Sequence, residues 1–251
     1  MMEERITSRK NPLLQQVKKL LSSGKARKEA GLFVSDGTKL LSEAVKYYAD
    51  NLETVILSDV VQAAVPEHVR LIRVPGDVME SISPMQTPQG ALFLCRLPDR
   101  ENFVPAPGML LLDGIQDPGN LGTMLRTADA LGVRVALLEG CADPYSHKVV
   151  RSSMGAVFRT PVVQTTWEAV QTACAKAGIP IAVTALSPRA SDIRQADVKK
   201  MAVVIGSEGQ GVRKEILDKA DAELIIPMTP HCESLNAAVA ASIVMWQMTT
   251  L

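Results

Sequence analysis

Three segments in the second half of the chain each join an apolar, strand-like run to a turn and then to a helix. They are Asp117–Arg126, Ile205–Gly211 and Ile226–Asn236. Junctions of this kind are where α/β domains present backbone N–H groups and polar side chains to a ligand. One such junction alone would be a weak signal. Three in this order, spread over about 120 residues, are a strong signal of an α/β fold that binds a ligand at such junctions.

The composition favours buried strands covered by helices. Of the 251 residues, 47% are hydrophobic but only 4% are aromatic. The core must therefore consist of Leu, Val, Ile, Ala and Met, which suits a sheet between helical layers. No apolar run reaches the ~18 residues that a membrane span requires, and the polar first residues differ from a secretory signal. We expect a cytoplasmic protein without a membrane partner.

The cysteines give no indication of a metal site. Cys95, Cys141, Cys174 and Cys232 are widely separated and lack the paired spacing of metal ligands. His231 stands next to Cys232, but no second pair of ligands accompanies it. We expect reduced cysteines and no bound metal.

Hydrophobic periodicity divides the chain into two α/β domains. Apolar residues at i, i+1, i+4, i+7 and i+8 predict an amphipathic helix over 13–21. The proline-rich stretch 98–107 predicts a linker between a first domain, 1–97, and a second domain, 108–251. The expected strands are 32–34, 52–58, 69–74, 90–97, 109–112, 133–138, 162–163, 181–185, 202–205 and 224–226, and further expected helices are 39–48, 121–131, 167–177 and 235–248.

Charge is balanced overall but unevenly distributed. The chain has 27 basic and 27 acidic side chains, so its net charge neither favours nor excludes a nucleic acid. Residues 1–28 hold eight Lys or Arg against two Glu, and residues 145–160 hold no acidic residue. A solvated helix face explains one such cluster, but two favour a polyanionic partner. The candidate nucleic-acid contacts are Arg9, Lys10, Lys18, Lys19, Arg27, Lys148 and Arg151.

The first junction combines turn and helix signals. Asp117-Pro118-Gly119 predicts a turn, and Asn120 is well placed to cap the helix that follows. Arg126 lies off the buried stripe of this helix. Its ordinary role would be a surface ion pair with Asp129. This segment alone therefore does not indicate a functional site, and the interpretation needs the other two segments.

The second junction is rich in glycine. Gly206-Ser-Glu-Gly209-Gln-Gly211 has three glycines in six residues, which allow a ligand to approach the backbone closely. The spacing fits neither a dinucleotide fingerprint nor a phosphate-binding loop. Glu208 would repel phosphate, so the turn favours a cationic or hydrogen-bond-donating ligand. A plain strand-to-helix turn is the alternative.

The third junction is an irregular loop before an apolar helix. We expect Ser234 to cap this helix, which is apolar on most faces and therefore buried. Asn236 would be a polar exception in its first turn, and a hydrogen-bonded core asparagine is the ordinary explanation of such a residue.

Together these residues resemble the SpoU (TrmH) branch of the SPOUT superfamily, the S-adenosylmethionine-dependent RNA 2′-O-ribose methyltransferases. The resemblance covers residues 117–132, 203–212 and 225–242, and a further segment, 148–156, also looks like the family. The N-terminal region, from Ile6 to Ala91, is similar to the family's L30e-like substrate-binding domain.

The resemblance implies the architecture and the cofactor. The fold class is α/β, with an N-terminal L30e-like α/β domain and a C-terminal SPOUT parallel-sheet domain that ends in a trefoil knot, a rare exception to unknotted topology. The resemblance also implies a homodimer and a bent S-adenosylmethionine among the three turns. The cofactor contacts that it implies are Ile205, Gly206, Ser207, Gly209, Ile226, Met228, Ser234 and Leu235.

The resemblance further implies a catalytic set of Arg126, Asn120, Glu208, Ser234 and Asn236. A base role is assigned to the arginine in this family, but a guanidinium hardly ever loses its proton in a protein. We prefer the hypothesis that Arg126 binds the adjacent phosphate and the emerging oxyanion. Asn120 and Glu208 would fix Arg126 and the cofactor loop, whereas Ser234 and Asn236 would order the third loop.

The implied substrate is ribosomal RNA of the 23S type, or else transfer RNA. The main alternative is a non-catalytic RNA-binding protein on a SPOUT fold. A nucleotide-binding phosphotransferase would need a phosphate-loop lysine and a carboxylate pair, neither of which stands at the glycine-rich turn. A base methyltransferase is a third alternative, but the set of Asn120, Arg126 and Ser234-Leu235-Asn236 points to ribose.

Overall fold

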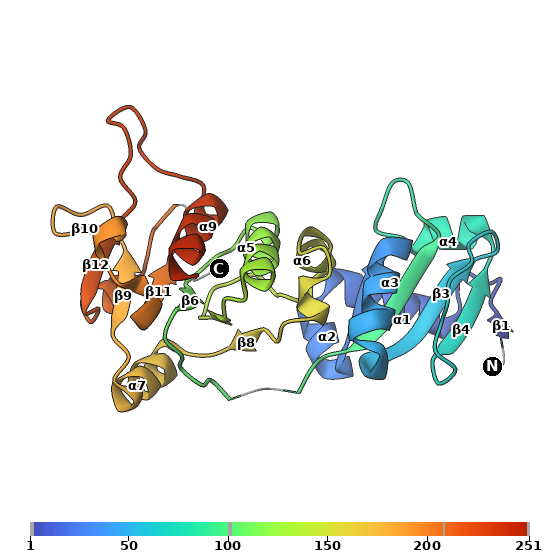
Figure 1. Ribbon diagram of the computed structural model, residues 1–251. Helices are drawn as coiled ribbons and strands as arrows, with labels where there is room; N and C mark the ends of the chain where they lie inside the picture. Colours follow the sequence, from blue (N-terminus) through green and yellow to red (C-terminus); the bar gives the residue numbers. More distant parts are fainter. Residues whose placement is uncertain (1–2, 100–101, 208, 250–251) are drawn as a thin grey trace. The chain divides into compact units, whose positions relative to one another are not determined.

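The computed structural model describes residues 3–99, 102–207 and 209–249. The chain forms two compact units (Figure 1). Unit 1 consists of residues 1–99 and 143–161, and unit 2 consists of residues 100–142 and 162–251. The segment 143–161 thus packs with the first unit, although we expected it within the second domain. The described part of the stretch 98–107 contains no helix or strand.

Unit 1 is built on a five-stranded mixed sheet with the order β1-β4-β3-β5-β2. Strands β1, β4 and β3 run parallel, while β5 is antiparallel to both β3 and β2. The strands are β1 (Glu3–Arg5), β2 (Leu32–Asp36), β3 (Leu52–Ser58), β4 (Arg70–Val74) and β5 (Ala91–Arg96). The helices are α1 (Pro12–Ser22), α2 (Gly24–Ala30), α3 (Thr38–Tyr47), α4 (Gly76–Ile82) and α6 (His147–Ser152), with short 3₁₀ turns at Ala49–Asn51 and Ala156–Phe158.

One face of this sheet is covered by α1 and α4. The expected apolar stripe of α1 is present, since Leu14, Val17 and Leu20 are buried against alternate residues of the strands. Asn11 caps the helix by accepting a hydrogen bond from the Leu13 amide, and Pro12 occupies the first helical position. This local chemistry explains why the predicted helix begins where it does.

The other face of the sheet receives the segment 143–161. Phe33 of β2 lies with its ring centroid 5.1 Å from that of Tyr145 and 6.3 Å from that of Phe158. Phe93 of β5 also contacts Phe158, at 6.1 Å. Four of the chain's few aromatic rings therefore meet here, and their burial ties residues 143–161 to the first unit.

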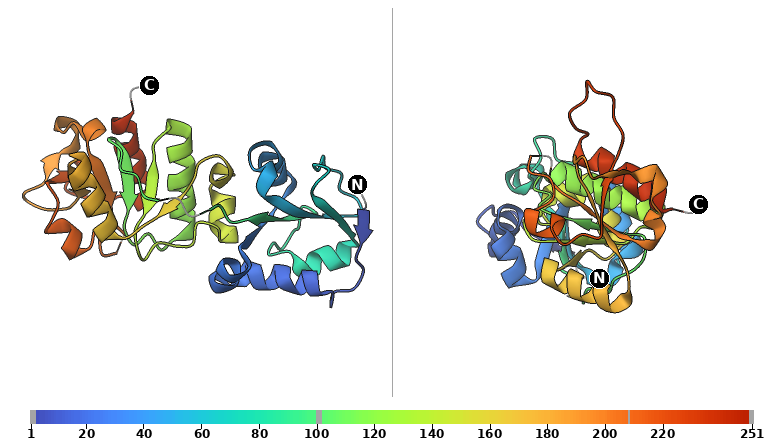
Figure 2. Two further views of the ribbon diagram at one scale, coloured as in Figure 1. Left: turned by 90° about the horizontal axis from the view of Figure 1, so that it is seen from below. Right: turned by 90° about the vertical axis from the view of Figure 1, so that its left-hand side faces the viewer.

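Unit 2 is a seven-stranded sheet with the order β10-β12-β9-β11-β6-β7-β8, in which the paired strands run parallel. Helices α5 and α9 pack side by side (Figures 1 and 2). The strands are β6 (Met109–Leu112), β7 (Val135–Leu137), β8 (Val163–Gln164), β9 (Ile181–Thr184), β10 (Ser191–Asp192), β11 (Ala202–Ile205) and β12 (Ala222–Ile225). The helices are α5 (Pro118–Leu131), α7 (Trp167–Ala177), α8 (Lys214–Leu217) and α9 (Ala237–Met248), with 3₁₀ turns at Ile193–Gln195 and Val198–Lys200.

The strand order fixes where a ligand can bind. From β6 the chain moves outward through β7 and β8, and then returns to the other side of β6 with β9 and β11. Strands β12, β9, β11 and β6 are neighbours and run parallel, so the loops that follow them lie at one edge of the sheet, where α/β folds bind ligands. The three junctions identified in the sequence follow β6, β11 and β12.

Candidate functional site

The first junction places a polar residue at the start of α5, but Asn120 does not cap the helix. Asp117 is the capping residue, since its carboxylate accepts a hydrogen bond of 2.7 Å from the Asn120 amide. Pro118 then takes the first helical position, for which its fixed φ is suited. The capping residue therefore lies three residues before Asn120, the one that we expected. The Asn120 side chain contacts α9 instead, as described below.

The glycine-rich junction after β11 is a closed turn. Ser207 and Gly211 exchange backbone hydrogen bonds of 3.2 and 2.9 Å. A Cβ atom on Gly206 would lie 2.1 Å from the carbonyl carbon of Gly211, so no other residue fits without opening the turn. Gly211 has a φ of +68°, which also favours glycine. The turn therefore requires both glycines for its own closure.

A buried carboxylate anchors the end of this turn. Asp113, directly after β6 and only 1% exposed, accepts hydrogen bonds from the Arg213 amide (2.9 Å) and from Arg213 Nε (2.7 Å). The same guanidinium reaches Glu139, after β7, at 2.9 Å. The sequence analysis did not identify Asp113 or Arg213. The acidic residue that ends a buried strand was the signal available for Asp113.

The third junction ends at Asn236, which is the capping residue of α9. Its Oδ1 accepts hydrogen bonds from the Ala238 amide (2.9 Å) and the Val239 amide (3.3 Å). The cap that we expected at Ser234 is thus two residues further along, and Ser234 lies exposed in the loop before it.

The amide group of Asn236 also joins two of the junctions. Its Nδ2 donates a hydrogen bond of 3.1 Å to Oδ1 of Asn120. These residues are separated by 116 positions in the sequence, so the contact exists only because α5 and α9 pack together. Ser242 of α9 and Thr127 of α5 make a second, longer contact of 3.4 Å.

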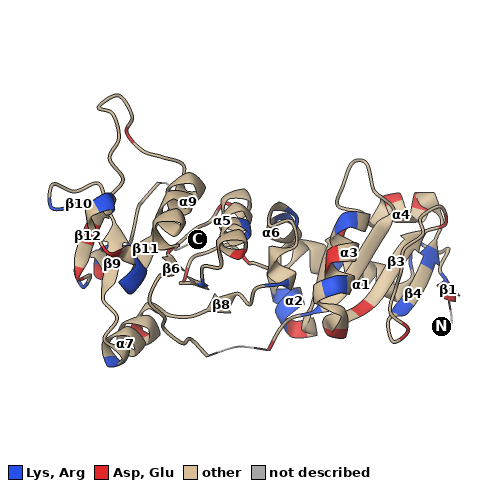
Figure 3. Cartoon of the chain, in the orientation of Figure 1, with Lys and Arg blue, Asp and Glu red and all other residues tan. Residues whose placement is uncertain are grey.

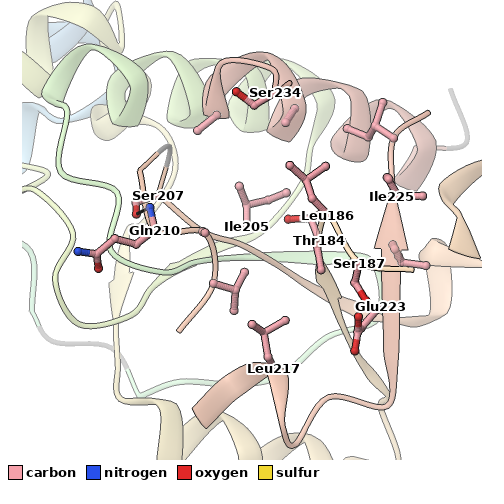
Figure 4. Close-up of a pocket in the computed structure, with 18 of the residues that line it drawn as sticks. Thr184, Leu186, Ser187, Ile205, Ser207, Gln210, Leu217, Glu223, Ile225 and Ser234 are labelled. Atoms are coloured by element: carbon pink, nitrogen blue, oxygen red, sulfur yellow. Dashed lines mark hydrogen bonds between the residues drawn. The ribbon is translucent and has the colours of Figure 1, made fainter. Parts of the chain in front are cut away.

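A cavity of about 570 Å³ lies between the second and third junctions and the loop after β9. Its size is within the range of small-molecule sites. Figure 4 shows Ser234 at one end, Leu217 and Glu223 at the other, and Ile205 and Leu186 between them. All the residues that we predicted as cofactor contacts line this cavity, namely Ile205, Gly206, Ser207, Gly209, Ile226, Met228, Ser234 and Leu235.

The wall of the cavity is mostly apolar or backbone, and the cations on it are neutralised. Arg189 pairs with Glu223 at 2.5 Å, and Lys214 pairs with Asp218 at 2.7 Å. A phosphate group would need uncompensated donors, whereas a flat base and a ribose need apolar surface and backbone hydrogen bonds. The cavity therefore suits a nucleoside without phosphates. The sequence analysis missed the end of β9 and the loop after it, which supply Thr184, Ala185, Leu186, Ser187 and Arg189.

Three of the predicted catalytic residues, Arg126, Asn120 and Asn236, do not line the cavity. Arg126 is exposed on α5, two turns beyond Asn120. Within the described parts of the chain, Arg126 has no ion-pair partner, so the expected pair with Asp129 does not occupy it. Asn120 and Asn236 lie beside the cavity rather than on its wall. Glu208 lies outside the described residues.

The predicted nucleic-acid contacts separate into two groups. Arg9, Lys10, Lys19 and Lys148 are exposed, and Lys18 is partly exposed; Figure 3 shows basic and acidic residues interspersed over unit 1. Arg27 is corrected: it is 6% exposed, its Nη1 donates to the Leu20 carbonyl, and its Nε donates to Asp143 at 2.8 Å. A buried side chain held in this way cannot reach RNA.

Arg151 has a structural partner as well. Its Nη1 lies 2.9 Å from Oδ2 of Asp36, whose other oxygen contacts His147 Nε2 at 2.7 Å. Asp36 is 3% exposed, so this pair helps to hold α6 on β2. The Arg151 side chain is 41% exposed, but Asp36 already compensates its charge.

Among the residues that the structure describes, no group of three or more His, Cys, Asp or Glu side chains is arranged to hold a metal ion. No helix among the same residues is both long and apolar enough to cross a membrane.

Comparison with known proteins identifies the family. The model of the SpoU rRNA Methylase family matches residues 107–246, and the MRM3-like substrate binding domain matches residues 11–92. The 23S rRNA (guanosine(2553)-2'-O)-methyltransferase RlmP of Bacillus subtilis is 32% identical over 247 residues, which cover 98% of this chain and 99% of that protein.

Solved structures agree with this result over nearly the whole chain. The AdoMet-bound rRNA methyltransferase from Sinorhizobium meliloti matches with a TM-score of 0.85 and 26% identity, covering 98% of this chain and 97% of its own. An RNA 2'-O ribose methyltransferase matches with a TM-score of 0.78 and 29% identity, covering 97% of both chains. The chain belongs to the SpoU rRNA methylase family.

Proposed function

We propose that this protein transfers a methyl group from S-adenosylmethionine to a ribose 2′-oxygen of RNA, with ribosomal RNA of the 23S type as the first candidate substrate. The observation that carries the proposal is the convergence of the junctions. The second and third line one cavity, and the hydrogen bond between Asn120 and Asn236 ties the first to the third. The relative from Bacillus subtilis is named for 2′-O-methylation of 23S rRNA, and the Sinorhizobium meliloti structure contains AdoMet.

The cavity is suited to the methyl donor. Its wall offers Ile205, Ile226 and Leu235 for the adenine ring and the closed glycine turn for backbone contacts. Arg189 and Lys214, the two cations among the described residues of the wall, are paired with carboxylates, so neither would strongly repel a sulfonium. When bound, S-adenosylmethionine supplies the electrophilic methyl group, and the protein's task is to orient the acceptor and to stabilise charge.

Arg126 is the residue that we assign to the acceptor. Its guanidinium keeps its proton, offers five donors and carries no compensating carboxylate among the described residues. It would hold the phosphate next to the reacting ribose and stabilise the negative charge that develops on the 2′-oxygen. Asn120 and Asn236 hold the start of α5 against the start of α9 and thereby position Arg126 relative to the cavity. The role of Glu208 in fixing the cofactor loop stays a prediction.

The test compares Arg126→Lys and Arg126→Ala with the wild type for methyl transfer and for donor affinity. We expect both variants to lose most turnover and to bind S-adenosylmethionine normally, since Arg126 does not line the cavity. Arg134→Ala is the matched control, because Arg134 is an exposed arginine just beyond the same helix. Near-normal turnover of both Arg126 variants would contradict the assignment.

The alternative of a non-catalytic RNA-binding protein is decided by the same assays. It predicts RNA binding without methyl transfer from the wild-type protein. To identify the substrate, 2′-O-methyl sites in total RNA are mapped with and without the protein. A missing methyl in ribosomal RNA supports the first candidate, and a missing methyl in transfer RNA supports the second.

We propose further that unit 1 has an L30e-like fold and recognises the RNA, in keeping with its match to a substrate-binding domain. Deleting residues 1–98 would be a poor test, because Tyr145 and Phe158 would lose their aromatic partners Phe33 and Phe93. Replacing Lys10, Lys18 and Lys19 by alanine leaves the core intact. This variant should bind RNA more weakly and with a shallower salt dependence. A control variant of unit 2 that carries Lys176→Ala and Lys199→Ala should keep the RNA affinity and the salt dependence of the wild type.

The trefoil knot and the homodimer are part of the same proposal. After β12, near one edge of the sheet, the chain returns to pack α9 on α5, β6 and β11, the path that a knotted C-terminal segment would follow. Val239 and Trp246 of α9 are 48% and 62% exposed and lie two turns apart, on a face that a second copy would cover. Light scattering should give twice the chain mass, and Trp246→Glu should shift the protein toward the monomer. A location in the cytoplasm stays a prediction.

A further inference from the structure

An exposed aromatic ring with two cations stands on the surface of unit 1. Tyr47 is the last residue of α3 and is 45% exposed. The Lys46 ammonium lies 4.7 Å from the centroid of its ring, and the Arg159 guanidinium carbon lies 5.5 Å from it. The neighbouring Tyr48 behaves differently, since it packs on Phe33 and Phe158 and donates its hydroxyl to the Arg96 carbonyl. Tyr48 is a structural residue, whereas Tyr47 is not needed for the core.

The ring of Tyr47 is held in place from the side. Arg159 forms an ion pair with Glu43, which lies one helical turn before Tyr47 on the same face of α3. The chain around Gly155 approaches closely, since a Cβ there would lie 3.2 Å from Cβ of Glu43. Arg159 is therefore fixed by a salt bridge to Glu43, next to which the chain at Gly155 packs closely, while it lies against the ring. Lys46, in contrast, is exposed and forms no ion pair among the described residues.

We propose that Tyr47 is a stacking site for an unpaired base of the RNA substrate, with Lys46 and Arg159 beside it to attract the adjacent phosphates. This inference rests on the proposed function. Aromatic rings stack on bases of any sequence, and nearby cations add attraction for the backbone. The Lys46 side chain is held by its contact with Tyr47 and by no ion pair among the described residues, so it can leave the ring when a base arrives. Arg159 would remain as the fixed support.

The chemistry favours single-stranded RNA over a duplex or a protein partner. Bases in a duplex are stacked on one another and cannot reach a side chain on a convex helix end. A protein partner would have to bring carboxylates for both cations, and Glu43 already compensates one of them. An acidic peptide is therefore the competitor to test.

The experiment measures the affinity of the full-length protein for a fluorescein-labelled single-stranded RNA of about twelve nucleotides and for the duplex of the same sequence. Tyr47→Ala should weaken binding of the single strand by about 5- to 160-fold, the loss typical of one stacked base. Tyr47→Phe should stay within about threefold of the wild type, because the ring is kept. Binding of the duplex should change little in either variant.

The controls separate stacking from folding and from charge. Val60→Ala removes another exposed apolar side chain of unit 1, 89% exposed, and should leave both affinities unchanged. Lys46→Ala should make the salt dependence of single-strand binding shallower by about one phosphate contact. Thermal unfolding of Tyr47→Ala should match the wild type, since the ring lies outside the core.

The inference is overturned if Tyr47→Ala binds the single strand as tightly as the wild type, or if Tyr47→Phe loses as much as Tyr47→Ala. It is also overturned if the wild type fails to bind single-stranded RNA. The same holds if poly-glutamate displaces RNA from the wild type but not from Tyr47→Ala, because an acidic peptide would then be the ligand of this site. Methyl transfer is measured in parallel on total RNA. Transfer by the wild type with an unchanged Tyr47→Ala variant refutes the stacking site alone, whereas the absence of transfer by the wild type refutes the proposed function.

Discussion

Adding a single methyl group at Gly206 should open the donor cavity, the cavity of about 570 Å³ in which we propose that the methyl donor S-adenosylmethionine binds. The Cβ of Gly206→Ala would lie 2.1 Å from the Gly211 carbonyl carbon and 2.2 Å from both the Gly211 oxygen and the Val212 nitrogen. These are backbone atoms, so no side chain can rotate away to relieve the overlap. The turn must separate, and the two hydrogen bonds between Ser207 and Gly211 would be broken or stretched.

The cost follows from these contacts. Each of the two hydrogen bonds contributes about 0.5–1.5 kcal/mol, and overpacking of a tight site typically costs about 1–3 kcal/mol. Because the same turn forms part of the cavity wall, we expect a cost of about 1–3 kcal/mol in donor binding. This corresponds to a Kd for S-adenosylmethionine that is about 5- to 160-fold weaker.

Gly209 provides the matched control. It lines the same cavity in the same turn, but a Cβ added there meets no described atom within 4 Å. Isothermal titration calorimetry of the two alanine variants should therefore show a large loss for Gly206→Ala and a change below about threefold for Gly209→Ala. Equal affinities of the two variants would refute the idea that closure of the turn shapes the donor cavity.

Four further predictions concern the supports of the site. Arg213→Ala leaves the buried Asp113 with only a backbone partner and should lower the free energy of unfolding by about 1.5–3 kcal/mol, measured by urea denaturation; an unchanged midpoint would contradict the anchoring role. Asn236→Ala removes a helix cap and should cost about 0.5–2 kcal/mol, whereas Asn236→Asp keeps the cap, loses the amide donor, and should lower turnover with little loss in thermal stability. Phe158→Ala removes a buried ring and should cost about 3–5 kcal/mol, with faster hydrogen exchange in β2 and β5; unchanged exchange would contradict the packing. Burial raises the pKa of the Cys141 thiol to about 11, so alkylation of Cys141, followed by mass spectrometry apart from the exposed Cys232, should be slow at pH 8 and rise steadily with pH up to about 11, while the stability that the neutral thiol contributes is lost as the pH rises from about 9 to about 11; alkylation of Cys141 at pH 8 as fast as that of Cys232 would contradict this.

Much of the cavity could be predicted because its chemistry is local. The glycines at 206 and 211 are dictated by a turn that closes on itself within six residues, and this pattern is legible without any tertiary contact. The apolar runs 109–112 and 202–205 have the bounds of β6 and β11, since a strand buried on both faces is apolar throughout.

Helix starts were less predictable because several residues compete for one cap. Asp117 and Asn120 both have capping side chains, as do Ser234 and Asn236. In the structure, Asp117 caps α5 and Asn236 caps α9. Sequence preference alone does not rank an aspartate against an asparagine or a serine. Packing of α5 on α9 brings Asn120 and Asn236 into contact, and the caps agree with that arrangement.

The sequence by itself determined the α/β class and the three junctions, because these depend on hydrophobic periodicity and on turns that close within a few residues. The cavity residues at the second and third junctions followed from the resemblance to a family, and only the tertiary structure brought the loop after β9 to the same cavity. Tertiary structure alone decided which basic residues are available to RNA. Arg27 finds Asp143 and Arg151 finds Asp36, each more than a hundred positions away along the chain. A cluster of positive charge in a sequence does not reveal its distant carboxylates, and only folding shows whether burial and pairing have already used that charge.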